Sequence, residues 1–273
     1  MSVQDVPKRL RKAARIVWRD RALVGAADAL KGAAALEPGG PSAAFGRWGL
    51  VPVYSRLAAL DTLDYAAQTL WSGGVHGHIR SRRQLIGEAG KLDGVPDETY
   101  DALLASHVVE HLANPLGALA EWQRVVRPGG YMLLIVPHRD GTFDHRRPLT
   151  SLAHLQADAA RDTGEDDLTH LEEILKLHDI ARDPGAPSRE VFERRCRENA
   201  SSRAMHHHVF ISRTAVDMCR AAGLDVLLVR PLLPHNIVCF CRVGQPHRDD
   251  LGEQELSAIL SSSPFASDRE AVL

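Results

Sequence analysis

The chain has 273 residues, of which 44% are hydrophobic and 25% are charged. These proportions are typical of a globular protein and exclude a disordered chain, a collagen-like fibre or a coiled coil. A formal net charge of −2 provides no general positive field, so we expect no nucleic-acid partner. No apolar run approaches the 18 residues of a transmembrane helix, and no apolar signal-peptide segment opens the chain. We therefore expect a cytoplasmic protein, whose four cysteines are reduced.

The first 32 residues combine basic and apolar side chains at helical spacing. This pattern predicts a basic amphipathic helix, and the simplest interpretation is a helix that packs on the domain with its charged face in water. A helix that binds a membrane surface or an acidic partner is the alternative.

Five short apolar runs follow, and each is typical of a buried strand. They cover residues 33–37, 56–61, 84–88, 101–106 and 131–137. A helical pattern separates the last two runs over 115–126, and Arg127-Pro128-Gly129-Gly130 is expected to end that helix. Strands that alternate with helices predict a parallel sheet with both faces covered.

This alternation stops after residue 137. Residues 138–210 are polar and contain eight of the 14 histidines, with helical patterns at 151–160 and 167–178. A further helix and two strands follow, and the link between these strands is too short for a parallel crossover. The expected organisation is therefore an N-terminal helix, a core in two parts, an insert between them and a polar tail (1–32, 33–137 with 211–245, 138–210 and 246–273). We expect this tail to be partly disordered or to form a loose terminal helix.

Acidic residues and glycines stand at the ends of the first three expected strands. Glu37 ends the first and is followed by Gly39 and Gly40, Asp61 ends the second, and Glu88 ends the third. In an open parallel sheet, ligands bind beyond the carboxyl ends of the strands, where glycines let a ligand approach the backbone. The glycine pair alone is equally consistent with a tight turn, and neither GxGxxG nor GxxxxGK[ST] is present.

In this order and at these spacings, the motifs resemble class I, type 11-like S-adenosylmethionine-dependent methyltransferases. The match is best over 84–137, which contains YDALLASHVVEHLANPLGALAEWQRVVRPGGYMLLIVP. The resemblance implies S-adenosylmethionine as cofactor. It also implies an α/β fold: a doubly wound, mostly parallel, seven-stranded Rossmann-like sheet with an antiparallel strand near the C-terminus and a helical insert after strand five. Eight residues would then surround the cofactor: Glu37, Gly39 and Gly40 at its methionine and ribose part, Asp61 at the ribose hydroxyls, Glu88 and Ala89 at the adenine, and Ser106 and His107 near the sulfonium.

Two departures from the family pattern affect this assignment. The family's glycine-rich loop reads DxGxGxG, whereas this chain has EPGGPS, in which Pro38 removes one backbone donor. Residues 41–60 resemble a loop more than the family's long helix. Asp64 is therefore an alternative to Asp61.

The insert also resembles a subgroup of these enzymes that methylate sugars and polysaccharides, through residues 138–150, 164–173 and 205–210. The resemblance implies an O-methyltransferase with a sugar or oligosaccharide acceptor. Methylation of another small hydroxylated metabolite or lipid, and a non-catalytic cofactor-binding scaffold, are the alternatives. The sequence leaves the oligomeric state open, a homodimer included.

Transfer of a methyl group to an alcohol requires that the hydroxyl lose its proton to a base or on a metal. Histidine is suited to this near neutral pH. We expect His145 as the base, Asp144 as a hydrogen-bond acceptor for the hydroxyl and His207, or a neighbouring histidine of 206–208, in the same pocket. A divalent cation such as Mg²⁺ is the alternative, but no HxH, HExxH or CxxC spacing identifies its ligands. His178 is expected to face solvent, and His111 to have a structural role.

Overall fold

A computed structural model describes residues 20–67, 81–244 and 250–272. Most of the expected N-terminal helix, residues 1–19, lies outside the described residues. The part that is described continues as helix α2, Arg21–Ala29, whose Leu23 and Ala27 are buried. No helix in the described ranges is long and apolar enough to cross a membrane.

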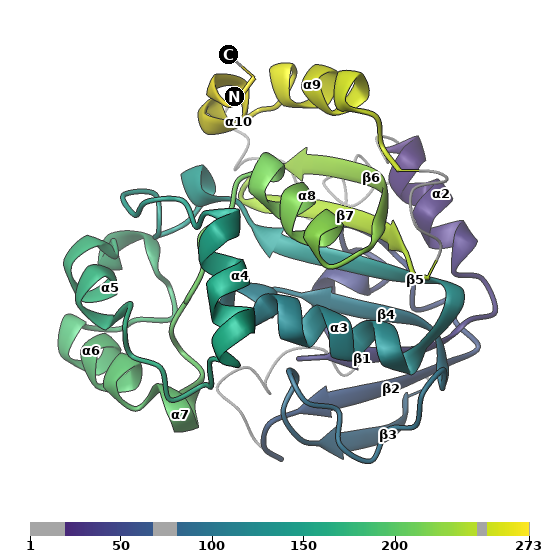
Figure 1. Cartoon of the computed structure of the whole chain (residues 1–273), viewed down its shortest axis with the longest axis horizontal. Helices are drawn as coiled ribbons and strands as arrows, with labels where there is room; N and C mark the ends of the chain where they lie inside the picture. Colours follow the sequence, from purple (N-terminus) through teal and green to yellow (C-terminus); the bar gives the residue numbers. More distant parts are fainter. Residues whose placement is uncertain (1–19, 68–80, 245–249, 273) are drawn as a thin grey trace, which may run out of the picture.

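The centre of the protein is a seven-stranded sheet with the order β3-β2-β1-β4-β5-β7-β6 (Figure 1). Strand β7 runs antiparallel to both of its neighbours, and the other pairings are parallel. This arrangement confirms the doubly wound, mostly parallel fold that the sequence predicts. The strands are β1 Ala34–Pro38, β2 Ala59–Asp64, β3 Ser81–Ile86, β4 Tyr100–Ser106, β5 Val126–Pro137, β6 Asp225–Leu232 and β7 Asn236–Arg242.

Helices cover both faces of this sheet because its inner strands are apolar on both sides. On β4, Leu103 and Ala105 belong to the core that includes residues of α3 (Pro115–Val125) and α8 (Ser212–Ala221). The alternate residues Ala102 and Leu104 belong to the core formed with α2 and residues 44–57. The described 3₁₀ turns are Ala43–Phe45, Val109–His111, Arg139–Gly141 and Ile180–Arg182.

Two strands differ in their limits from the sequence prediction. Strand β2 ends at Asp64 rather than Asp61, because Thr62 and Leu63 continue the buried run. Strand β5 begins at Val126 and includes the proline and glycines that were expected to separate helix from strand. The first difference moves the carboxyl end of β2 by three residues and changes which acid stands there.

The insert, residues 138–210, contains four helices. These are α4 Leu152–Arg161, α5 Leu171–Leu177, α6 Arg189–Arg197 and α7 Asn199–Ser202. Of these, α4 packs on the main core through Leu155. Figure 1 shows α5, α6 and α7 together beyond the carboxyl ends of the parallel strands. Leu171, Ile174, Phe192 and Met205 form a small apolar core within the insert.

The C-terminal residues 250–272 are packed, which differs from the loose tail that the sequence suggests. They contain helices α9, Glu253–Ser261, and α10, Ala266–Glu270. Leu256 and Leu260 are buried in the main core, although the segment as a whole is polar. Two well-spaced apolar side chains are therefore sufficient to fix a helix that composition alone describes as solvated.

Candidate active site

A cavity of about 350 Å³ opens at the carboxyl ends of β1, β2 and β4. We call it the strand-end cavity. Five of the eight residues expected at the cofactor line it: Gly39, Glu88, Ala89, Ser106 and His107. Glu37, Gly40 and Asp61 do not belong to its lining.

The glycine loop contributes its backbone to this cavity. Gly39 has a φ of +70°, and a Cβ atom there would lie 2.6 Å from Val108 Cγ2. Both the backbone conformation and the space therefore require glycine. Its N–H donates to Leu63 O over 2.8 Å, which holds the loop against β2.

Glu37 lies beneath this loop and is fully buried. Its carboxylate accepts hydrogen bonds from Ser42 N at 2.9 Å and from the Tyr54 hydroxyl at 2.8 Å. Burial raises the pKa of Glu37 to about 8, against the opposing effect of these hydrogen bonds. A Cβ at Gly40 would lie 2.4 Å from Glu37 Cδ, so Gly40 leaves the space that this carboxylate occupies. In the structure, Glu37 and Gly40 hold the loop in place and do not line the cavity.

The second strand presents Asp64, not Asp61, to the strand-end cavity. Asp61 is buried nearer the amino end of β2, where its Oδ2 accepts hydrogen bonds from Arg83 at 2.9 Å and from Tyr100 at 3.0 Å. Asp64 stands at the carboxyl end, and burial raises its pKa to about 6. The structure thus favours the alternative that the loop-like residues 41–60 suggest.

The insert also reaches the strand-end cavity, through Arg203. Arg203 Nη2 lies 2.6 Å from Glu88 Oε1, and its guanidinium carbon lies 5.5 Å from the centre of the Tyr65 ring. No local motif marks this arginine in the sequence, because its partners are more than 100 residues away.

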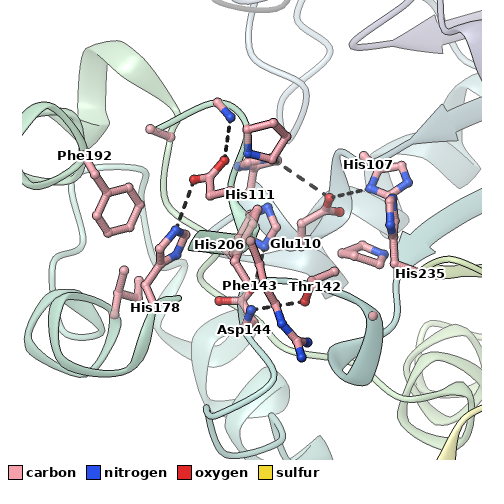
Figure 2. A pocket seen from close by; sticks show the side chains of 18 of the residues that line it. His107, Glu110, His111, Thr142, Phe143, Asp144, His178, Phe192, His206 and His235 are labelled. Atoms are coloured by element: carbon pink, nitrogen blue, oxygen red, sulfur yellow. Dashed lines mark hydrogen bonds and ion pairs between the residues drawn. The ribbon is translucent and has the colours of Figure 1, made fainter. Parts of the chain in front are cut away.

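A second cavity, of about 480 Å³, lies between the sheet and the insert (Figure 2). We call it the insert cavity. His107 and His111 line both cavities, so the two adjoin at these side chains. The position of the second cavity, beyond β4 and β5, follows from the insertion point of residues 138–210 after β5.

Aromatic rings form one side of the insert cavity. The ring of His178 stacks on Phe192 with 3.9 Å between centres and lies 4.3 Å from Phe143. Its Nε2 is 3.1 Å from Asp183 Oδ2, and the residue is only 5% exposed. The expectation that His178 faces solvent is therefore wrong, because helix α6 folds back over the end of α5.

Among the three residues expected to be catalytic, Asp144 lines the insert cavity. Its Oδ2 accepts from His206 Nδ1 at 2.6 Å, and its Oδ1 accepts from Arg147 at 3.0 Å. Burial alone would raise the pKa of Asp144, but His206 and Arg147 outweigh it and lower the pKa to about 2. Asp144 is therefore ionised at neutral pH.

The other two expected residues lie outside both cavities. His145 Nε2 is 3.0 Å from Asp179 Oδ2, and His207 Nε2 is 3.1 Å from the Asn199 amide nitrogen. The histidine that reaches the insert cavity is His206, the first of the three consecutive histidines 206–208. The triplet marks the region in the sequence but does not indicate which ring faces the cavity.

Three residues that follow β4 stand between the cavities. His107 has a φ of +56°, and its Nε2 lies 3.0 Å from Asn236 Oδ1. Its Nδ1 lies 3.5 Å from Oε1 of Glu110, which is fully buried. Burial lowers the pKa of His107, but Glu110 and Asn236 reverse this, so the net shift is upward. His111 Nδ1 is 3.0 Å from Met205 O, which connects this turn to the insert.

Comparisons with known proteins agree with this architecture. Residues 41–134 match the family model described as a methyltransferase domain. Among curated proteins, the sequence has no match.

Similar solved structures include a 1,6-didemethyltoxoflavin-N1-methyltransferase from Burkholderia thailandensis, with 16% identity, 85% of this chain and 83% of that chain covered, and a TM-score of 0.46. An S-adenosylmethionine-dependent methyltransferase from Mesorhizobium loti has 14% identity, covers 81% and 96% of the two chains, and has a TM-score of 0.47. An arsenic(III) S-adenosylmethionine methyltransferase from Chlamydomonas reinhardtii has 14% identity, covers 90% and 72%, and has a TM-score of 0.42. The substrates that these names state are those of the three proteins.

The matched methyltransferase domain, the strand order and the cavity at the strand ends together support S-adenosylmethionine-dependent methyltransferase activity, with S-adenosylmethionine as the cofactor.

Proposed function

We propose that this methyltransferase transfers the methyl group of S-adenosylmethionine to a hydroxyl of a sugar or polysaccharide. The observation that carries the proposal is that the strand-end and insert cavities adjoin at His107 and His111. A donor in the first cavity and an acceptor in the second would lie next to each other, as an in-line displacement requires.

The strand-end cavity suits the cofactor. Close approach to the backbone at Gly39 leaves room for the methionine part, and the Asp64 carboxylate can accept hydrogen bonds from ribose hydroxyls. Leu63 and Ala89 provide apolar surface for adenine. When bound, the cofactor supplies an electrophilic methyl group on a sulfonium. In this assignment Asp64 takes the role that the resemblance gave to Asp61.

The insert cavity supports a polyhydroxylated acceptor. A sugar ring has an apolar C–H face and a rim of hydroxyls. Phe143 and Phe192 offer aromatic faces, while Asp144 and Arg195 offer charged hydrogen-bonding groups in the same cavity. A purely apolar acceptor would form no hydrogen bonds with these groups.

Methylation of a hydroxyl releases one proton, and we propose His235 as its acceptor. His235 lines the insert cavity and lies edge-on to His107, with 5.4 Å between ring centres. Burial and the neighbouring His107 lower its pKa, so its imidazole is neutral at neutral pH and can take up a proton. His145, which was expected in this role, and His207, which was expected in the same pocket, lie outside the cavity.

The test is methyl transfer to defined glycosides, followed by mass spectrometry of the product and measurement of S-adenosylhomocysteine. A matched series replaces one acceptor hydroxyl at a time with hydrogen. We expect transfer to stop when one particular hydroxyl is removed and to persist when the others are. Transfer to amines, or to hydroxylated lipids and metabolites but to no sugar, would contradict the proposal.

A further inference from the structure

Three side chains that bind metals in other proteins converge where the two cavities meet. They are Glu110, His111 and His206, and one ligand atom of each lies within 4.8 Å of the other two. Glu110 Oε1 is 4.0 Å from His111 Nε2, and the rings of His111 and His206 are 4.5 Å apart. Figure 2 shows the three side chains pointing toward one another from the turn after β4 and from the strand-like segment before α8.

The carboxylate of Glu110 is incompletely satisfied. It is fully buried, and neither oxygen has a hydrogen-bond partner within the described part of the chain. The nearest imidazole nitrogens are His107 Nδ1 at 3.5 Å and His111 Nε2 at 4.0 Å. Burial of a carboxylate costs several kcal/mol unless a cation or hydrogen bonds compensate it. A cation between Glu110 and the imidazoles would supply that compensation.

The rings of His111 and His206 are each oriented by a contact of their Nδ1 atom. His111 Nδ1 is 3.0 Å from the carbonyl oxygen of Met205, and His206 Nδ1 is 2.6 Å from the carboxylate of Asp144. These oxygens only accept, so each Nδ1 carries the hydrogen, which leaves Nε2 of a neutral ring as the electron-pair donor. Metal-binding histidines almost always have such a carbonyl or carboxylate partner.

We propose that Nε2 of His111, Nε2 of His206 and a carboxylate oxygen of Glu110 bind one divalent transition-metal ion. Two imidazoles and a carboxylate are a donor set of catalytic Zn²⁺ sites, in which a further position stays open for a ligand. Mg²⁺ prefers oxygen donors only. The open position would face the insert cavity, since all three residues line it.

The role of this ion rests on the proposed function, whereas its binding does not. A hydroxyl that contacts a divalent cation loses its proton more easily. The proton would pass to His235, the oxygen would bond to the methyl carbon, and the carbon–sulfur bond would break with its electron pair on sulfur. The metal is neither oxidised nor reduced.

A second histidine cluster provides a matched control. His154, His170 and His208 also present ligand atoms within 4.8 Å of one another, outside both cavities. His208 differs in orientation, because its Nε2 is 3.4 Å from Ala113 O and its buried Nδ1 has no hydrogen-bond partner within the described residues.

The experiment is metal binding by the full chain after treatment with a chelator. Zn²⁺ and Co²⁺ are added separately, and metal content, the Co²⁺ absorption spectrum and the Tm are measured. We expect Glu110→Gln and His206→Gln each to bind one equivalent less than the wild-type protein. We expect His170→Gln to keep this equivalent and its Co²⁺ spectrum. Addition of Zn²⁺ should raise the Tm of His170→Gln but not the Tm of Glu110→Gln.

Binding of S-adenosylhomocysteine, measured by calorimetry, shows whether each variant is folded. If His206→Gln does not fold, Glu110→Gln still tests the site, because glutamine has the shape of glutamate. Equal metal content in wild-type protein and Glu110→Gln would overturn the site. Full methyl transfer to a sugar by chelated enzyme that binds no Zn²⁺ would overturn it while leaving the proposed function intact. Zn²⁺ binding at these residues without transfer to any sugar hydroxyl would overturn the proposed function and leave the metal site intact.

Discussion

The strand-end cavity and the insert cavity are lined by different kinds of residue. The strand-end cavity is bounded by the backbone of Gly39 and by small side chains such as Ala43, Ala89 and Ser106, all at or near strand ends. The insert cavity is bounded by rings and charged groups that several segments of the insert bring together. The glycine-loop side of the first cavity therefore depends on the absence of a side chain, whereas the second cavity depends on particular side chains. Substitutions should separate cofactor binding from acceptor binding accordingly.

The largest effect should come from a side chain added to the strand-end cavity. In Gly39→Val, the left-handed backbone and the 2.6 Å approach to Val108 Cγ2 force the loop to move. We expect the affinity for S-adenosylhomocysteine to fall by roughly 100-fold, equivalent to about 3 kcal/mol. Calorimetry measures it. Gly32→Val is the control, because Gly32 has a φ of +80° but nothing within 4 Å of its added Cβ. Equal affinities of the two variants would show that the loop does not contact the cofactor.

A carboxylate at the end of β2 should give the next largest effect. Asp64→Asn should weaken cofactor binding by roughly 10- to 100-fold, since hydrogen bonds to a charged group contribute about 1.5–3 kcal/mol. Asp61→Asn should leave binding nearly unchanged, because Asp61 is paired with Arg83 and Tyr100. The pKa of Asp64 is raised to about 6, so wild-type affinity should decline as the pH falls below 6. The opposite ranking of the two variants would restore Asp61 as the ribose ligand.

In the insert cavity, removal of a ring should affect the acceptor alone. Phe143→Ala should raise the acceptor KM by about 10-fold, because it removes apolar contact surface, and should leave cofactor affinity unchanged. Steady-state kinetics with varied acceptor measure the first and calorimetry the second. His145→Ala is the neighbouring control, as its side chain faces Asp179 outside the cavity. A change in cofactor affinity in Phe143→Ala would mean that the two cavities are not separable.

The last prediction concerns stability rather than binding, and its residue is Glu37 beneath the glycine loop. Its pKa is raised from 4.5 to about 8, so between these values the folded protein holds a proton that the unfolded chain has released. The free energy of unfolding should therefore decrease as the pH rises through this window, by up to about 1.4 kcal/mol per pH unit from this group. Urea unfolding across pH measures it, and Glu37→Gln should flatten the dependence. An unchanged slope in Glu37→Gln would assign the pH dependence to other groups.

Sequence patterns predict the strand-end cavity better than the insert cavity for a physical reason. Gly39, Glu88 and Ser106 stand next to apolar runs that form strands, and parallel strands bring their carboxyl ends to one edge. Asp61 was expected at the end of its strand, but an acid can also be buried within a strand when Tyr100 and Arg83 satisfy it.

The insert offers no such periodicity. Glu110 and His206 are almost 100 residues apart, and they are brought together by contacts between their segments, such as His208 N with Glu110 O. His206 and His207 are adjacent in the sequence, yet only His206 reaches the insert cavity. Composition therefore locates the chemistry in this segment, whereas the choice among its histidines depends on tertiary contacts.

The buried carboxylate of Asp268 in α10 touches both ends of the insert. Its Oδ1 lies 3.1 Å from His138 Nε2, and it accepts from Ser212 N at 2.8 Å and from Ser212 Oγ at 2.7 Å. His138 and Phe210 also pair directly as a parallel bridge. The two ends of the insert therefore lie side by side. Because the entropy of closing a loop grows only slowly with its length, residues between these ends can be exchanged or lengthened at little cost to the sheet. The lining of the insert cavity can therefore change while most of the strand-end cavity, to which the insert contributes Arg203, stays the same.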